Sequence, residues 1–317
     1  MRSFTVLTLS TAFMPVVAFA GADCGNPPLK TAEAVYTIKT PEQAASRIEA
    51  PVVVETQNVQ TVDVVKTAQV EDVKMVEKTQ DKMMKTAAPV AAYADLLKNR
   101  ISRGEGGLNL FDYEAAHNAG ELATVTAYTD YLSSQNPDAM SENDQIAYWA
   151  NLYNALTLKV VLENYPVKSI RKIKSGLLSI GPWDRDATVV NGETLTLNNI
   201  EHDILRKKYP NPSYVHYMVN CASIGCPNLA DKLWTGATLE TDREQAARDF
   251  INSPRGVKIK GDTLEVSSIY QWFKGDFGGS KSETLKHLRE FAGPDLAAAI
   301  DAGAKIDGHD YNWSLNQ

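Results

Sequence analysis

The sequence has few cysteines and no concentration of positive charge. Its 317 residues include three Cys, 32 Lys and Arg, and 39 Asp and Glu, which give a net charge of −7. A protein that binds nucleic acid needs a cationic surface against the phosphates, so the absence of any basic block argues against nucleic acid as a partner. The hydrophobic fraction of 44% and the charged fraction of 22% are typical of a globular protein.

Long hydrophobic runs are missing after the first twenty residues. Arg2 precedes an uncharged apolar run that ends in Ala-Phe-Ala at residue 20, which is the pattern of a secretory signal peptide cleaved before Gly21. An uncleaved signal anchor is the alternative, but Pro15 and the small residues at the end of the run disfavour it. We therefore expect a periplasmic or secreted protein with no stable membrane span after signal cleavage.

Aromatic residues and glycine are absent from residues 52–90. Without aromatic anchors, such a segment cannot bury enough apolar area to offset the entropy lost on ordering. We predict a signal peptide over 1–20, a low-complexity, disordered tether over 21–90, and a single compact domain over 91–317. A coiled-coil helix is the alternative for the tether, but its heptads are irregular.

The domain begins with helical patterns and continues with shorter strand patterns. The clearest helix runs from Ser141, a capping residue, to Tyr165, where Pro166 stops it. We predict an α+β fold with a mostly helical first half, followed by a small, largely antiparallel sheet with packed helices. The other predicted elements are helices over 91–98, 112–135 (one or a pair), 198–210, 242–252, 282–292 and 295–302, a hairpin over 187–197 with an Asn-Gly turn, and strands over 214–219, 257–260 and 264–266.

Two amides lie one turn apart on the helix over 141–165, which is apolar nearly all round. A buried amide costs about 1–3 kcal/mol unless it is hydrogen-bonded. Asn151 and Asn154 therefore either fix a neighbouring loop or face a site, and the first role is the commoner one for a single amide.

Three charged or titratable residues lie on the helix over 198–210. Glu201 follows Asn198 by three residues, so the pair predicts a capping box, in which Glu201 would have a structural role and no functional one. His202 and Arg206 are four residues apart and share a helix face. A surface histidine with ordinary partners is the default interpretation of His202.

Two cysteines follow the apolar run over 214–219, which we interpret as a buried central strand that ends at Asn220 and Cys221. Functional residues are common where a buried strand ends in a loop. Cys221 admits three interpretations: a nucleophile, a small buried hydrophobic residue, or half of a Cys221–Cys226 disulfide formed after export.

Four segments together resemble the domain of unknown function 547 family of bacteria and plants. They are AYWANLYNALTLKVVLENYP, LTLNNIEHDILR, VHYMVNCASIGCP and YNWSLN, in that order within residues 108–317. The resemblance implies that the signature positions are Asn151, Tyr153, Asn154, Glu201, His202, Arg206, Cys221 and Pro227. It also implies that the position of Cys226 varies more than that of Cys221, which weakens the disulfide interpretation without removing it. The family has no agreed activity, so it supplies candidate residues and no mechanism.

One function hypothesis is a cysteine-dependent hydrolase or acyl transferase that acts on an amide or ester in the cell envelope. Cys221 would be the nucleophile, His202 its base, Glu201 the group that orients the ring, and Asn154 an oxyanion donor. The order is unlike that of papain-like enzymes, because the histidine comes first and lies on a helix. A sulfur bonded to Cys226 would exclude this hypothesis.

The second hypothesis is a non-catalytic module that binds a peptide or a carboxylate, so whether the protein is an enzyme stays open. Asn151, Tyr153, Arg206 and Asn220 would line the pocket, with Arg206 making a bidentate contact. The partner would be an unknown envelope peptide or small molecule.

No metal or other cofactor is expected. The C-x4-C spacing is not a common zinc pattern, and strand alternation would point His216 away from Cys221.

Overall fold

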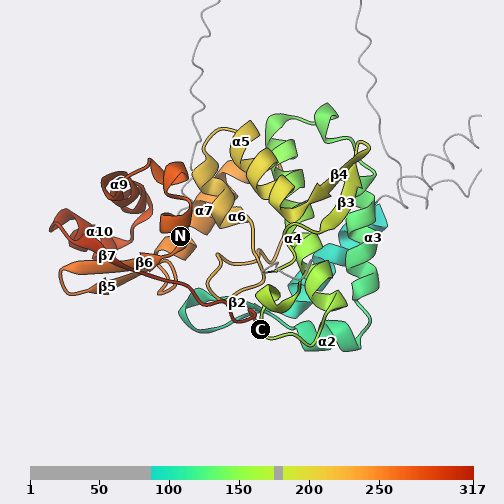
Figure 1. Cartoon of the computed structure of the whole chain (residues 1–317), viewed down its shortest axis with the longest axis horizontal. Helices are drawn as coiled ribbons and strands as arrows, with labels where there is room; N and C mark the ends of the chain where they lie inside the picture. Colours follow the sequence, from blue (N-terminus) through green and yellow to red (C-terminus); the bar gives the residue numbers. More distant parts are fainter. Residues whose placement is uncertain (1–86, 175–180) are drawn as a thin grey trace, which may run out of the picture. The chain divides into compact units, whose positions relative to one another are not determined.

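A computed structural model describes residues 87–174 and 181–317, and all the described residues belong to one compact unit (Figure 1). The predicted signal peptide and most of the predicted tether lie outside these ranges. Residues 87–100 are helical. The last residues that we assigned to a disordered tether, 87–90, are therefore part of a helix.

Helices dominate the described residues. The α-helices after residue 100 are α2 (Tyr113–Asn118), α3 (Leu122–Ser133), α4 (Glu142–Glu163), α5 (Arg206–Lys208), α6 (Val215–Met218), α7 (Leu239–Ile251), α8 (Ile269–Trp272), α9 (Lys281–Phe291) and α10 (Pro294–Asp301). A π-helix, η5 (Asn199–Leu205), precedes α5. Short 3-10 helices are η2 (Glu105–Gly107), η3 (Pro137–Ala139), η4 (Ile170–Lys172), η6 (Pro212–Tyr214) and η7 (Lys274–Phe277).

The strands form small sheets, as the predicted α+β class requires. They are β1 (Ile101–Arg103), β2 (Asn109–Phe111), β3 (Asp186–Val190), β4 (Glu193–Thr196), β5 (Val257–Lys260), β6 (Thr263–Ser267) and β7 (Lys305–Asp310). The pairs β1–β2, β3–β4 and β5–β6 are antiparallel, and β7 joins β6 in parallel. The predicted Asn-Gly turn is confirmed in β3–β4, where Asn191 and Gly192 have φ of 51° and 81°. We did not predict β7, because Ile306 is its one large apolar residue.

Helix α4 organises the first hydrophobic cluster. Ser141 caps it by accepting the amide hydrogen of Asp144 at 3.3 Å, and the acidic residues of its first turn favour the helix dipole. Leu152 and Leu156 are almost fully buried, so α4 is surrounded by other parts of the cluster. The predicted cap of this helix is confirmed.

A second hydrophobic cluster forms around β5, β6, β7, α7 and α9. Phe250, Val266 and Phe291 are among its buried members. In Figure 1 these elements gather on one side of the described unit, and α3, α4, β3 and β4 lie on the other. Helix α6 contributes to both clusters, since Met218 belongs to the first and Tyr217 to the second.

Most of the segment 214–219 is helical, as the end of η6 and the whole of α6, so its prediction as a central strand was wrong. Val219 donates its amide hydrogen to the carbonyl of Val215 at 3.1 Å and closes a helical turn. The run is apolar because the two clusters bury it from both sides. A short apolar run does not reveal by periodicity whether it is a strand or a buried helix.

No helix in the described parts of the chain combines the length and the apolar character that a bilayer crossing requires.

Candidate functional site

A pocket of about 640 Å³, counting its part that is open to solvent, is lined by residues of both hydrophobic clusters. Tyr153 of α4 and Val219 belong to the first cluster, and Ile269 of α8 belongs to the second. Six of the fifteen lining residues carry a phenyl, phenol or indole ring. The aromatic lining residues are Tyr153, Trp183, Trp272, Phe273, Tyr311 and Trp313. Such a lining is typical of sites that bind small molecules or peptide side chains.

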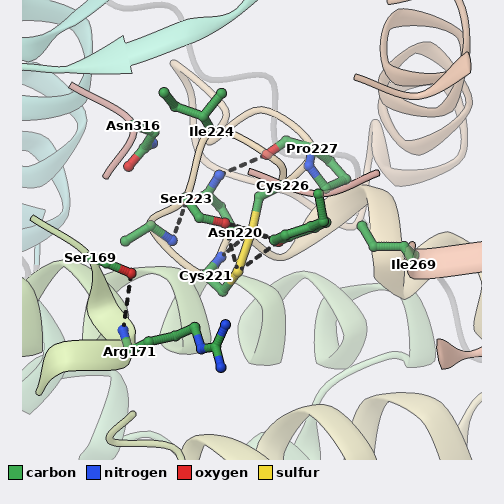
Figure 2. Close-up of a disulfide and its surroundings, with 12 residues drawn as sticks. Ser169, Arg171, Asn220, Cys221, Ser223, Ile224, Cys226, Pro227, Ile269 and Asn316 are labelled. Atoms are coloured by element: carbon green, nitrogen blue, oxygen red, sulfur yellow. Dashed lines mark hydrogen bonds between the residues drawn. A yellow bond between two sulfur atoms is a disulfide. The ribbon is translucent and has the colours of Figure 1, made fainter. Parts of the chain in front are cut away.

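A disulfide forms part of the pocket wall. Cys221 and Cys226 both line the pocket and are bonded to each other, with their Cα atoms 6.3 Å apart. Figure 2 shows the bond across the short loop that joins them. The side chain of Asn220 holds this loop: its amide donates to the carbonyl of Pro227 at 2.7 Å, and its oxygen accepts the amide hydrogen of Ala222 at 2.7 Å.

The C-terminal segment lies against the disulfide loop. The amide of Ile224 donates to the carbonyl of Ser314 at 2.9 Å, and the amide of Gly225 donates to the carbonyl of Asn312 at 2.8 Å. A Cβ atom at Gly225 would lie 2.9 Å from the backbone nitrogen of Asn312, so glycine is needed for this approach. Tyr311 and Trp313 of this segment both pack on Trp272, with ring centroids 4.8 and 5.7 Å from its ring.

The two sulfurs differ in exposure and in hydrogen bonding. Cys221 is partly exposed, whereas Cys226 is 3% exposed. The amide hydrogen of Cys221 points at Sγ of Cys226 over 3.0 Å. The Tyr311 hydroxyl lies 3.2 Å from Sγ of Cys221 and 3.1 Å from Sγ of Cys226. Within the described ranges, Sγ of Cys221 contacts the hydroxyls of Ser223 and Tyr311 and makes no hydrogen bond to His202.

Glu201 lies at the pocket and is not the predicted capping acid. Asn198 makes no capping hydrogen bond and has helical φ and ψ. Its side-chain amide donates instead to the Asp184 carboxylate at 2.6 Å. The Glu201 side chain is 11% exposed, with Oε1 3.8 Å from Nδ1 of His202. Burial and then the Glu201 carboxylate raise the pKa of Tyr153 well above its usual value. Glu201, Tyr153 and His202 therefore form a polar end of a pocket whose other lining residues include several aromatic ones.

Arg206 reaches the polar end with Nη1, which lies 3.2 Å from Nδ1 of His202, and it pairs with an acid that we did not predict. Its Nε and Nη2 donate to the two carboxylate oxygens of Asp276 at 2.6 and 3.1 Å, and Nε2 of His216 lies 2.7 Å from the same carboxylate. Burial would raise the pKa of Asp276, but the hydrogen bonds from His216 and Arg206 outweigh it and lower that pKa to about 2. The expected bidentate contact of Arg206 with a ligand carboxylate is thus made internally.

Asn151 and Asn154 hold neighbouring loops by hydrogen bonds to backbone groups, in line with the structural interpretation of the two amides. Asn151 donates to the carbonyl of Trp234 at 2.8 Å and accepts the amide hydrogen of that residue at 3.1 Å. Asn154 donates to the carbonyl of Met218 at 2.9 Å and accepts the amide hydrogen of Asn220 at 2.8 Å. Asn154 therefore connects α4 to the start of the disulfide loop.

The structure brings together half of the residues that we singled out. Tyr153, Glu201, His202 and Cys221 line the pocket, whereas the remaining four of the eight candidates are not among its lining residues. Those four are Asn151, Asn154, Arg206 and Asn220. Sequence reasoning missed Trp183, Trp272 and Phe273 as pocket residues, because their positions depend on contacts between distant segments. For Tyr311 and Trp313 a signal existed, since they fall in the fourth of the segments that resemble a family.

His216 and Cys221 line the same pocket, contrary to the expectation that they would point apart. The expectation was wrong because it assumed strand alternation in a segment that is helical. Among residues 87–174 and 181–317, no three His, Cys, Asp or Glu side chains are grouped so as to hold a metal ion.

The chain matches DUF547, described as "Protein of unknown function", over residues 137–251. This match confirms the predicted resemblance. Three of the four segments that carry the resemblance lie inside the DUF547 match, and YNWSLN lies beyond its end. Searches of curated proteins and of solved structures returned no match.

The DUF547 match includes the pocket residues up to Pro227 and leaves out those from Ile269 onward. Tyr153, Glu201, His202 and the disulfide lie within residues 137–251. Trp272, which also lines the pocket, lies outside the match. The pocket of this chain is therefore built by the DUF547 segment together with the residues that follow it.

Proposed function

We propose that the protein is an exported, non-catalytic module that binds a peptide or small molecule in the aromatic pocket. One observation carries this proposal: the pocket is open, and the sulfur that would act as its nucleophile is bonded to Cys226. A disulfide sulfur has no thiolate to attack a carbonyl. A cysteine hydrolase would therefore require the reduced protein.

The polar end of the pocket favours a ligand that donates hydrogen bonds. Glu201 is the acidic residue of the lining, and its carboxylate accepts hydrogen bonds. Aromatic faces attract cations, so the aromatic walls also favour a protonated amine, which is both a cation and a hydrogen-bond donor. Arg206 is engaged by Asp276, so a ligand carboxylate lacks the partner that we expected. The ligand group at this end is therefore an amine or a hydroxyl, attached to an apolar or aromatic group.

Export supports the same proposal. The first twenty residues have the pattern of a cleaved signal peptide, and disulfides persist in oxidising compartments outside the cytosol. Fractionation of cells that express the full chain tests this part, with the mature protein expected in the periplasm or the medium. Full-length protein retained in the cytosol would contradict it.

A matched pair of ligands tests the binding function. Phenethylamine and 3-phenylpropionate share a ring and a short linker and differ in the charge of the end group. Ligand-observed NMR should detect saturable binding of the amine that is at least about tenfold tighter than that of the acid, a difference of about 1.4 kcal/mol. Trp272→Ala should weaken binding of both, and Glu201→Gln should weaken binding of the amine alone.

The possible outcomes test the chemical class of the ligand separately from the binding function. Tighter binding of the acid, lost in Trp272→Ala, would refute the role of Glu201 and keep the binding module. If neither compound binds, or if binding is unchanged in Trp272→Ala, the pocket is not the binding site for such ligands.

A further inference from the structure

The disulfide that lines the pocket is asymmetric, and the asymmetry has a chemical consequence. Cys221 is partly exposed at the pocket, whereas Cys226 is 3% exposed. An incoming thiolate must approach a sulfur in line with the bond that breaks, so the more exposed sulfur is the one it can attack. Attack at Cys221 leaves Cys226 as the departing thiolate.

Hydrogen-bond donors surround the sulfur that would depart. The amide hydrogen of Cys221 points at Sγ of Cys226 over 3.0 Å, and the hydroxyl of Ser223 donates to the same sulfur over 3.4 Å. The Tyr311 hydroxyl lies 3.1 Å from it. Donors to a thiolate stabilise it and lower its pKa, and a sulfur with a lower pKa leaves faster. The two hydroxyls also reach Cys221, so the backbone amide is the donor that distinguishes Cys226.

A partly buried cation lies beside the same cysteine. The guanidinium of Arg255 donates through Nη1 to the backbone carbonyl of Cys226 and to that of Ile224, the latter over 3.3 Å. Its Nη2 donates to Asn228 at 2.9 Å. Within the described residues, no carboxylate forms an ion pair with Arg255, so its charge is not neutralised by a direct partner. A positive charge close to a cysteine favours the thiolate.

We propose that this disulfide is a site of thiol–disulfide exchange, in which a thiol ligand held by the aromatic walls forms a mixed disulfide with Cys221. The thiolate sulfur of the ligand forms a bond to Sγ of Cys221, the Cys221–Cys226 bond breaks, and its electron pair stays on Sγ of Cys226 as a thiolate. No further oxidant or reductant is needed, and the reverse attack by Cys226 releases the ligand. The co-reactant is a thiol attached to an aromatic or apolar group, such as a cysteine beside an aromatic residue in a peptide.

Benzyl mercaptan is a suitable probe, because its ring fits the aromatic walls. The protein should carry Cys24→Ser, since Cys24 is a third cysteine in the chain. After incubation and acid quenching, peptide mapping by mass spectrometry should find the benzylthio adduct on Cys221. An adduct on Cys226, or equal amounts on both, would overturn the proposal.

Single-cysteine variants test the assignment without the disulfide. In the Cys24→Ser background, Cys226→Ser leaves Cys221 free, and Cys221→Ser leaves Cys226 free. With 5,5′-dithiobis(2-nitrobenzoate), the first should react at least about tenfold faster than the second, because Cys226 is buried. Equal rates, or a faster Cys221→Ser variant, would contradict the proposal. Circular dichroism of both variants shows whether they are folded, and the adduct on the intact disulfide stands as a test if one is not.

Tyr311→Phe tests the stabilisation of the departing thiolate. It removes one donor, so the disulfide should react about fivefold more slowly with 2-mercaptoethanol. An unchanged or faster rate would refute a role for that hydroxyl in the exchange. Because 2-mercaptoethanol does not require an aromatic pocket, this rate does not depend on the proposed binding function. Failure of either proposal can therefore be recognised separately.

Discussion

The two hydrophobic clusters reach the pocket with different chemistry. The first, around α4, contributes Tyr153, and its buried amides Asn151 and Asn154 are satisfied by backbone groups. Next to the second lies an ionisable network in which Asp276 joins Arg206 and His216. These two amides of the first cluster are neutral, while the network beside the second cluster depends on charge. We therefore expect low pH and charge-removing substitutions to destabilise mainly the second cluster.

Asp276→Asn should have the largest effect. It leaves Arg206 and His216 without their shared carboxylate in a partly buried network, and removal of one partner from a fully buried ion pair costs about 3–5 kcal/mol. We expect urea denaturation to show a loss near the lower end of that range. Asp301→Asn, which breaks an exposed pair with Arg289, is the matched control and should cost less than about 1 kcal/mol. Equal losses would refute the contrast between the two pairs.

Asn154→Ala should have the next largest effect. It leaves a buried carbonyl at Met218 and a buried amide at Asn220 without partners, at a cost of about 2–3 kcal/mol in the free energy of unfolding. Asn164→Ala is the control: among the described residues its side chain bonds only to the carbonyl of Val160, one turn earlier, so the loss should stay below about 1 kcal/mol. A cost for Asn154→Ala no greater than that of the control would show that the amide does not fix the loop.

His287 should make the second cluster sensitive to mild acid. Burial, and then the nearby His216, lower the pKa of His287 from 6.5 to about 4. Between these two values the unfolded chain binds a proton that the folded protein does not, so stability is present above pH 6.5 and is lost as the pH falls toward 4. The loss should be about 2 kcal/mol after allowance for partial exposure.

Denaturation of wild type and His287→Gln at several pH values measures this effect. Glutamine keeps a polar partner for the Tyr217 hydroxyl, which lies 2.7 Å from Nε2 of His287. The variant should have a flatter profile between pH 6.5 and 4. Identical profiles would place the acid sensitivity elsewhere in the molecule.

Trp272→Ala should have the smallest effect on stability. The residue is 48% exposed, so its removal should lower the free energy of unfolding by less than about 1 kcal/mol in chemical denaturation. A loss above about 2 kcal/mol would mean that Trp272 belongs to the second cluster and is not primarily a pocket residue.

The parts of the structure that were predictable are those governed by local sequence. Ser141 and Pro166 mark the limits of α4, and the Asn-Gly pair fixes the β3–β4 turn, because caps and turns depend on a few neighbouring residues. Helix α6 was missed because both clusters bury it, so its sequence lacks the alternation of apolar and polar residues that marks a helix with one exposed face. Asp276 was missed as a partner of Arg206 because 70 residues separate them, and no local pattern reports such a contact.

Mass spectrometry of the exported protein, digested with trypsin without reduction, tests the central claim most directly. Cys221 and Cys226 fall in the same tryptic peptide, residues 209–232. If the disulfide forms a wall of a binding pocket, this peptide should be lighter than its reduced form by the mass of two hydrogens and should resist alkylation. A peptide that is alkylated at Cys221 before any reductant is added would contradict the account and would favour a free nucleophilic thiol.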